Sequence, residues 1–366
     1  MIVGVPREIK VQEYRVALTP EGVAEFIKNG HSVIVENNAG IGSSISNESY
    51  VAAGATIIES ADQLWQQADL ILKVKEPIAA EYSRMRENQI LFTYLHLAAS
   101  KACTDALIKS KTTAIAYETV EVDGSLPLLI PMSEVAGRMA TQVGADALLK
   151  PKGGRGVLLA GVPGVSPGKV IVIGAGIAGL NAAVIALGMG ADITVLDKSA
   201  KRLAHIDQVY GGRIKTLMSS TVSIQKSIYD ADLVIGAVLI PGAKAPKVVT
   251  NQDVAKMKSG SVLVDIAIDQ GGCFEDSKPT THENPTYQVH ESFFYCVANM
   301  PGAVPVTSTY ALTNVTLPFA LQIANLGWHK ALAANPNLAK GLNTHDGKVT
   351  YKAVAEAHGY EFSPIF

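Results

Sequence analysis

The chain has 366 residues, of which 48% are hydrophobic and 17% are charged, and its formal net charge is −2. This length favours two domains, and the composition is typical of a globular protein with large buried sheets, which excludes a disordered chain. No cluster of basic residues is suited to neutralising phosphates, so we expect neither DNA nor RNA as a partner.

The three cysteines, Cys103, Cys273 and Cys296, stand far apart and form no CxxC pair. This pattern is typical of reduced, buried thiols in a cytoplasmic protein, and it predicts neither a disulfide framework nor a metal site. The N-terminal segment carries charges by residue 7 and lacks a long apolar core, so we do not expect a secretory signal.

Strands alternate with helices along the first third of the chain. We predict strands at residues 2–5, 31–36, 68–77, 89–98 and 112–120. The first helix is expected to have Thr19 as its N-cap, Pro20 at its first position and Gly30 at its end. The segments ADQLWQQA and KACTDALIKS are also compatible with helices. Such alternation predicts a parallel sheet covered on both faces.

The middle of the chain begins with a long helix and continues as a second α/β pattern. The helix is predicted to start at Ser133, its N-cap, and to end before Pro151, which would make it a joint between domains. The glycine-rich residues 153–168 are expected to form an ordered loop and a short strand. Six strands then follow in α/β alternation, the number typical of a Rossmann domain, at residues 169–174, 191–197, 213–219, 231–239, 260–269 and 293–300.

A long apolar helix after Pro305 is predicted to return the chain to the first domain. The expected fold is therefore α/β, with two Rossmann-like doubly wound domains and an active-site cleft between them. Residues 1–130 and 306–366 would form a discontinuous substrate-binding domain. Residues 131–305 would form the NAD-binding domain.

Gly174, Gly176 and Gly179 form a G-x-G-x-x-G motif after a β run and at the start of a helical segment. In dinucleotide-binding domains these glycines permit a tight turn, close approach to the pyrophosphate and close helix–strand packing. Asp197 follows at the end of the next strand, where a carboxylate accepts hydrogen bonds from the ribose hydroxyls and repels a 2′-phosphate. The motif thus predicts NAD, although Lys201 and Arg202 leave room for NADP.

An alternative interpretation of the same region is a membrane span, because Val170 to Ala191 contains no charge. The run contains five glycines and changes from β-branched residues to an alanine-rich segment. A buried strand, turn and helix explain both halves of the run, so we favour the soluble interpretation.

Several titratable residues are candidates for substrate chemistry. Lys73 and Lys75 alternate near a predicted strand end, where lysines are usually solvated. His96 lies in an apolar run, where it is either a core residue or an acid/base group. Arg15 lies in a polar loop and cannot be ranked above Arg7 from the sequence alone.

Asp269 ends the predicted apolar strand VLVDIAID and precedes Gln-Gly-Gly. It either starts a turn or faces the nicotinamide, since ligands of doubly wound sheets lie at the carboxyl ends of the strands.

Longer motifs closely resemble the bacterial L-alanine dehydrogenase family. They are GVPREIKVQEYRVALTP, LKVKEP, FTYLHLA, AYETVE, GGRGVLLAGVPGV, VDIAIDQGG and ANMPGAVP. The resemblance extends from residue 1 into the C-terminal helix. Related proteins are the nucleotide-binding subunit of transhydrogenase and, more distantly, saccharopine dehydrogenase.

The resemblance implies an NAD-dependent oxidoreductase of L-alanine catabolism that converts L-alanine, NAD and water reversibly to pyruvate, ammonium and NADH. It implies that Arg15 and Lys75 bind substrate and that His96 and Asp269 are catalytic. It also implies a homohexamer, while the cysteine pattern already predicts a cytoplasmic protein without a metal site. The residues implied to contact NAD, besides the three glycines, are Ser133, Ile177, Ala178, Asp197, Arg202, Ser219, Val238, Leu239, Ile266, Ala267, Ile268, Asp269, Lys278, Val297, Ala298, Asn299 and Met300.

In the implied mechanism Arg15 would hold the substrate carboxylate by a two-pronged contact, and Lys75 would polarise the carbonyl or carbinolamine oxygen. His96 would move protons during imine hydration, because an imidazole titrates near neutral pH. Asp269 would either orient the amino group or relay protons. Alternative functions are a soluble transhydrogenase subunit and a non-catalytic NAD-binding sensor.

Overall fold

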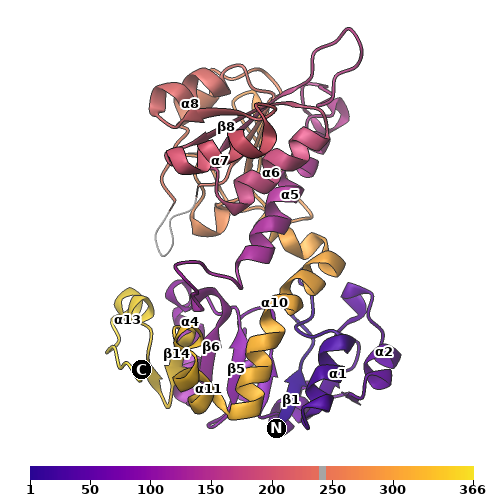
Figure 1. Cartoon of the computed structure of the whole chain (residues 1–366), viewed down its shortest axis with the longest axis vertical. Coiled ribbons are helices and arrows are strands. Elements are labelled where there is room, and N and C mark those ends of the chain that lie inside the picture. Colours follow the sequence, from indigo (N-terminus) through magenta and orange to yellow (C-terminus); the bar gives the residue numbers. More distant parts are fainter. Residues whose placement is uncertain (239–244) are drawn as a thin grey trace. The chain divides into compact units, whose positions relative to one another are not determined.

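The computed structural model describes residues 1–238 and 245–366 (Figure 1). The chain forms two compact units. The first contains Met1–Met132 and Val304–Phe366, and the second contains Ser133–Ala303. Both chain termini belong to the first unit (Figure 1).

The first unit is built on an eight-stranded sheet. Six parallel strands lie in the order β3-β2-β1-β4-β5-β6, which is the doubly wound order 3-2-1-4-5-6. They are β1 (Ile2–Val5), β2 (Ser32–Glu36), β3 (Thr56–Ile58), β4 (Leu70–Leu72), β5 (Ile90–Thr93) and β6 (Thr113–Ala116). The antiparallel strands β14 (Leu342–His345) and β15 (Lys348–Val349) extend the sheet beyond β6.

Helices from both ends of the chain complete this unit (Figure 1). The long helix α10 packs against α1, α11 and the turn Ile41–Ser43, so the C-terminal segment belongs to the N-terminal core. The helices are α1 (Pro20–Lys28), α2 (Asn47–Ala52), α3 (Ala61–Gln67), α4 (Lys101–Ser110), α10 (Pro305–Leu326), α11 (Trp328–Ala334), α12 (Pro336–Ala339) and α13 (Lys352–His358).

The predicted boundaries of α1 are confirmed. Thr19 is the N-cap, and its side chain accepts a hydrogen bond from Gly22 N at 3.4 Å. Pro20 occupies the first position, where its missing N–H costs nothing. The chain leaves the helix through Gly30, whose φ of +81° suits glycine.

The strands β4 and β5 are shorter than predicted, because side chains replace the sheet as acceptors of backbone hydrogen bonds. Strand β4 ends at Leu72, and Val74 N donates to the carboxylate of Glu8 at 2.6 Å. Strand β5 ends at Thr93, and His96 N donates to Glu118 at 2.6 Å. Lys73, Lys75 and His96 therefore lie in loops, and their predicted strand positions were wrong.

The second unit is built on a seven-stranded sheet in the order β12-β13-β11-β10-β7-β8-β9. Six parallel strands occur at the predicted places, again in doubly wound order, but most are shorter than predicted: β7 (Lys169–Ile173), β8 (Asp192–Asp197), β9 (Lys215–Met218), β10 (Leu233–Gly236), β11 (Val262–Asp265) and β13 (Ser292–Tyr295). The antiparallel strand β12 (Thr286–Val289) was not predicted. The helices are α5 (Ile130–Ala147), α6 (Ile177–Gly188), α7 (Ala200–Tyr210), α8 (Thr221–Ile228) and α9 (Asn251–Val254).

Three further predicted details of the second unit were wrong. Helix α5 begins at Ile130 and has Pro131 in its first turn, where proline is well tolerated, so Ser133 lies inside the helix and is not its N-cap. The short strand predicted within 153–168 is only an isolated bridge between Val162 and Val165. Strand β11 ends at Asp265, so Asp269 does not end it.

The uncharged run from Val170 to Ala191 forms β7 and α6, so the membrane alternative was wrong. None of the helices in the described part of the chain has both the length and the apolar character needed to cross a membrane. The three cysteines are buried and free of disulfides. Burial raises the pKa of Cys103 to about 12 and that of Cys296 to about 11, which makes these thiols poor nucleophiles.

Candidate active site

The glycine motif of the second unit has the geometry that a dinucleotide turn requires. Gly174 has a φ of +105°, and a Cβ atom at Gly179 would lie 1.8 Å from the carbonyl oxygen of Gly174. A Cβ atom at Gly176 would meet nothing within 4 Å, so this glycine faces open space. Helix α6 starts directly after Gly176 without a side-chain cap, which leaves its first N–H groups for an anion such as a pyrophosphate.

Asp197 lies at the carboxyl end of β8, beside this turn. Its carboxylate accepts hydrogen bonds from Ala175 N and Ser199 N, each at 2.7 Å, and it pairs with Arg202 at 3.6 Å. Each carboxylate oxygen has a second lone pair for a ribose hydroxyl. A pocket of about 340 Å³ adjoins this site and is lined by Ala175, Leu180, Ser199, Lys201, Arg202, His205 and Ile206. The turn, the carboxylate and the pocket fit the adenosine end of NAD.

Most of the other predicted NAD contacts follow the carboxyl ends of the second unit's strands. Leu239 lies outside the described residues, and Ser133 lies on α5. Lys278 lies on the loop before β12, with its ammonium 4.4 Å from the centre of the Tyr287 ring. The remaining positions are Ile177 and Ala178 after β7, Ser219 after β9, Val238 after β10, Ile266 to Asp269 after β11, and Val297 to Met300 after β13.

Asp265 was not predicted as a site residue, yet it organises the loop that carries Asp269. Its fully buried carboxylate accepts hydrogen bonds from Ala267 N at 3.0 Å, Cys273 N at 2.8 Å and Ser277 Oγ at 2.5 Å. Asp269 itself is exposed, in the 3₁₀ turn Ile268–Gln270. Asp265 is the first aspartate of the segment VLVDIAID. It was missed as a site residue because the predicted strand 260–269 placed it in the strand interior.

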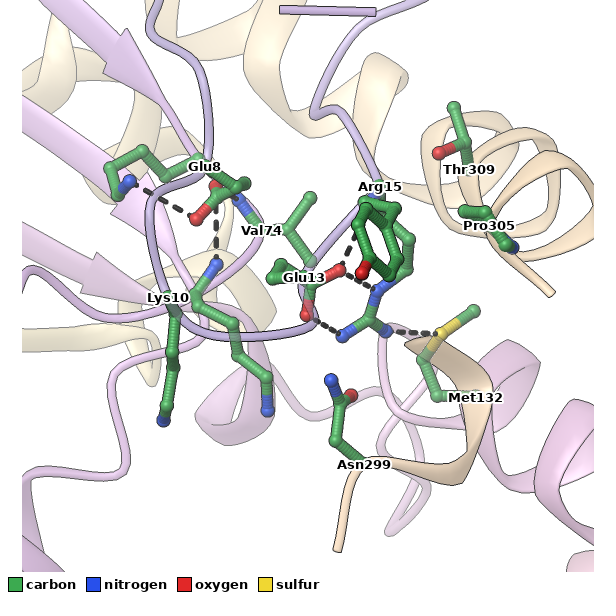
Figure 2. A network of polar contacts seen from close by, with 12 residues as sticks. Glu8, Lys10, Glu13, Arg15, Val74, Met132, Asn299, Pro305 and Thr309 are labelled. Carbon is green, nitrogen blue, oxygen red and sulfur yellow. Dashed lines mark hydrogen bonds and ion pairs between the residues drawn. The ribbon is translucent and has the colours of Figure 1, made fainter. Parts of the chain in front are cut away.

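Arg15 is almost fully buried in the first unit, on the loop between β1 and α1 (Figure 2). Glu13 receives its Nε at 2.6 Å and its Nη2 at 2.5 Å, and Arg15 Nη1 donates to the Met132 Sδ at 3.0 Å. Burial works to raise the pKa of Glu13, but the hydrogen bonds and charge of Arg15 outweigh it and hold that pKa below its usual range. Arg7 is more than half exposed and pairs with Glu36, so the two arginines have different surroundings.

Lys73 was expected to be solvated, but it is fully buried between two carboxylates. Its ammonium lies 3.1 Å from Glu8 and 2.8 Å from Glu81. Burial alone would lower the pKa of Lys73, but the charges of Glu8 and Glu81 raise it, so the lysine stays protonated. Because Glu8 also binds Val74 N, this cluster ties the loop after β1 to the loop after β4 (Figure 2).

Lys75 is half-buried on the loop after β4. Its backbone is held from two sides, since its N–H donates to Glu8 at 3.4 Å and its carbonyl oxygen accepts from Thr93 Oγ1 at 3.1 Å. Strands β1 and β4 are neighbours at the topological switch point of this sheet, the place where doubly wound domains bind ligands. Arg15 and Lys75 thus follow the two strands that flank this point.

His96 lies just beyond β5, in the left-handed conformation with φ of +48°. Glu118, from the end of β6, holds this backbone by accepting from Leu95 N and His96 N. The imidazole is exposed and stacks on the Tyr94 ring with a centroid distance of 5.9 Å, so the interpretation of His96 as a core residue was wrong. Three of the four predicted substrate-site and catalytic residues therefore belong to one sheet edge of the first unit, whereas Asp269 belongs to the second unit.

Two family profiles match successive parts of the chain. Residues 4–136 match "Alanine dehydrogenase/PNT, N-terminal domain", and residues 140–352 match "Alanine dehydrogenase/PNT, C-terminal domain". The chain belongs to the alanine dehydrogenase/PNT family.

Relatives within the alanine dehydrogenase/PNT family match the chain over nearly its whole length. The alanine dehydrogenase of Mycolicibacterium smegmatis is 63% identical over 357 residues, which cover 97% of this chain and 96% of that protein. The alanine dehydrogenase of Bacillus subtilis is 59% identical, with coverage of 100% and 96%.

Solved structures agree with this family membership. An L-alanine dehydrogenase structure matches with a TM-score of 0.96 and 48% identity, covering 98% of this chain and 99% of that one. A transhydrogenase structure from Sinorhizobium meliloti matches with a TM-score of 0.82 and 26% identity, covering 96% and 100%.

The glycine turn gives a paired prediction. Gly179→Ala places a methyl group against the Gly174 carbonyl, so we expect both a lower melting temperature and weaker NADH binding. Gly176→Ala meets no protein atom, so it should keep the melting temperature and weaken only NADH binding. Thermal unfolding and NADH fluorescence titration measure both. Equal loss of stability in the two variants would contradict this interpretation of the turn.

Proposed function

We propose that the protein catalyses the reversible oxidative deamination of L-alanine with NAD: L-alanine, NAD⁺ and water give pyruvate, ammonium, NADH and a proton. The observation that carries this proposal is the full-length similarity to alanine dehydrogenases, which include relatives of 63% and 59% identity. We assign NAD to the second unit, predicted as residues 131–305, and the substrate to the first, predicted as residues 1–130 and 306–366. NAD, when bound, accepts the hydride from the substrate Cα.

Arg15 holds the substrate carboxylate in this proposal. The planar guanidinium both neutralises and orients a carboxylate, which a single ammonium group does less well. Lys75 lies across the switch point of the same sheet, and we assign its ammonium to the carbonyl oxygen of pyruvate and the hydroxyl of the carbinolamine. Support comes from the loops after β1 and β4, which Glu8 ties together.

His96 is the proposed acid/base group. Its imidazole is exposed, and its backbone is fixed by Glu118, so the ring can exchange protons without moving the loop. It removes a proton from the water that adds to the imine and returns one to the departing ammonia. We propose that the exposed Asp269 of the second unit assists this exchange and that the NAD contacts predicted from the sequence hold the cofactor.

The transhydrogenase alternative is not favoured, because the solved transhydrogenase is 26% identical and the solved L-alanine dehydrogenase 48%. A non-catalytic NAD sensor is also not favoured. Such a protein would need neither the cations Arg15 and Lys75 nor the imidazole of His96 at the same sheet edge.

The activity is tested with purified protein, ammonium and a panel of 2-oxo acids, with oxidation of NADH followed by absorbance. We expect ammonium-dependent oxidation with pyruvate, and a preference for NADH over NADPH because of Asp197. Oxidation that does not require ammonium, or none with pyruvate, would contradict the proposal.

The role of His96 gives a second prediction. His96→Asn keeps a residue that tolerates the left-handed backbone but removes the imidazole ring. We expect kcat to fall about 100- to 10,000-fold, the usual span for a positioned acid/base group, with NADH binding and melting temperature unchanged. A stable variant that binds NADH and turns over at nearly the normal rate would remove His96 from the mechanism.

We also propose a cytoplasmic homohexamer. Three exposed apolar side chains, Leu158, Val162 and Val165, lie on the glycine-rich segment of the second unit, where a second copy could cover them. Sedimentation analysis should give a hexamer that Val162→Ser with Val165→Ser weakens. A wild-type monomer at micromolar concentration would exclude this assembly.

A further inference from the structure

Arg15, the proposed substrate anchor, is bound by a carboxylate of its own loop, that of Glu13. One oxygen of Glu13 receives both Arg15 N at 3.1 Å and Arg15 Nε at 2.6 Å, and the other receives Nη2 at 2.5 Å (Figure 2). The Glu13 carboxylate therefore binds both the backbone N–H group and the guanidinium of Arg15. The two side chains are 0% and 2% exposed, so water does not compete for these bonds.

We propose that Glu13 is a positioning residue of the reaction: it fixes the plane of the Arg15 guanidinium and decides which edge receives the substrate carboxylate. This inference rests on the proposed role of Arg15. It adds a function for a residue that the sequence motifs did not single out.

The hydrogen bonds of Arg15 differ in strength in a way that supports this role. The Nε and Nη2 groups are held by a charged carboxylate, whereas Nη1 donates to a thioether sulfur, which is a weak acceptor. Of these two acceptors, the Met132 sulfur is the weaker, so a substrate carboxylate displaces it from Nη1 more easily than it displaces Glu13 from Nε and Nη2. We therefore infer that the Glu13–Arg15 pair persists when substrate binds.

Other contacts hold the same loop without Glu13. Glu8 binds Val74 N, Glu36 accepts from Arg7 N at 2.9 Å, and Val16 N donates to Thr309 Oγ1 at 3.1 Å. Removing the Glu13 charge therefore releases the guanidinium while the loop keeps its anchors. Glu36→Gln is the matched control, because Glu36 is a buried carboxylate that holds this loop but has no role in orienting Arg15 in our proposal.

The positioning role and a simple charge role predict opposite effects on substrate affinity. If Glu13 acted only through its negative charge, Glu13→Gln would strengthen binding of the anionic pyruvate. If Glu13 positions Arg15, the same substitution weakens binding, because the glutamine NH₂ group faces a guanidinium N–H and leaves the fork unsupported.

The experiment compares four single variants, Glu13→Gln, Glu13→Asp, Glu36→Gln and Arg15→Lys, with the double variant Glu13→Gln/Arg15→Lys. For each variant we measure KM for pyruvate, kcat, the affinity for NADH and the melting temperature. We expect Glu13→Gln to raise KM about 10- to 100-fold, the size of one lost charge-assisted hydrogen bond, with NADH affinity unchanged. Glu13→Asp should also raise KM, since its carboxylate is one methylene nearer the backbone and cannot reach Nε and Nη2 of the guanidinium in the same geometry. In the Arg15→Lys background, Glu13→Gln should change KM less than about threefold, because no fork remains to orient.

Several outcomes would overturn the inference. They are an unchanged or lowered KM in Glu13→Gln, a normal KM in Glu13→Asp, equal damage from Glu36→Gln, and a full effect of Glu13→Gln in the Arg15→Lys background. If Glu13→Gln fails to fold, the KM for pyruvate of Glu13→Asp tests the inference by itself. A normal KM in Arg15→Lys would instead remove Arg15 from the substrate site, which is a failure of the proposed function and is recognised separately.

Discussion

Both sheets of this protein place their first and fourth strands side by side, and the chemistry depends on that constraint. In a doubly wound sheet the chain leaves two such strands toward opposite faces, so a crevice opens at their carboxyl ends. In the second unit the loop after β7 is the glycine turn. In the first unit the loops after β1 and β4 carry Arg15 and Lys75. The same strand order thus forms a nucleotide site in one unit and a cationic site in the other.

The loops of the cationic site carry the buried charges of Arg15 and Lys73, and buried charges require partners. Removing one partner of a buried ion pair typically costs about 3–5 kcal/mol, so such pairs fix the loops that carry them. Lys73 has two carboxylates and Arg15 has one, all within the first unit. Carboxylates also end the strands, because Glu8 and Glu118 take backbone N–H groups that a longer strand would pair. One carboxylate, Glu8, therefore both pairs with the buried Lys73 and takes the backbone N–H group beyond the end of β4.

The sequence predicted the architecture well, because hydrophobic periodicity and glycine positions are local signals. The six parallel strands of the second unit, the caps of α1 and the turn at Gly174 all follow from neighbouring residues. Strand ends were overestimated, as at Asp269, because a strand ends where a tertiary contact replaces its ladder. Lys73 was misjudged for the same reason, since its partner Glu8 lies 65 residues away in sequence. The antiparallel β12 carries only a short apolar pattern and was missed.

The site was predicted to different degrees for similar reasons. The glycine motif and Asp197 are recognisable because spacing alone specifies their geometry. The roles of Arg15, Lys75 and His96 came only from the family resemblance, because single residues in loops carry no periodic signal. Glu13, Glu118 and Asp265 support these residues and the NAD loop, and no spacing rule identifies them. Supporting carboxylates become visible only when their hydrogen bonds are known.

The central claim is that substrate is anchored at the carboxyl edge of the first unit's sheet by cations that carboxylates hold in place. A crystal structure of the protein with NADH and pyruvate tests it most directly. We predict the pyruvate carboxylate on the Arg15 guanidinium, its carbonyl oxygen at the Lys75 ammonium, and Glu13 still bound to Nε and Nη2 of Arg15. Pyruvate bound away from Arg15 and Lys75, or Glu13 displaced from Arg15 by the substrate, would contradict the account.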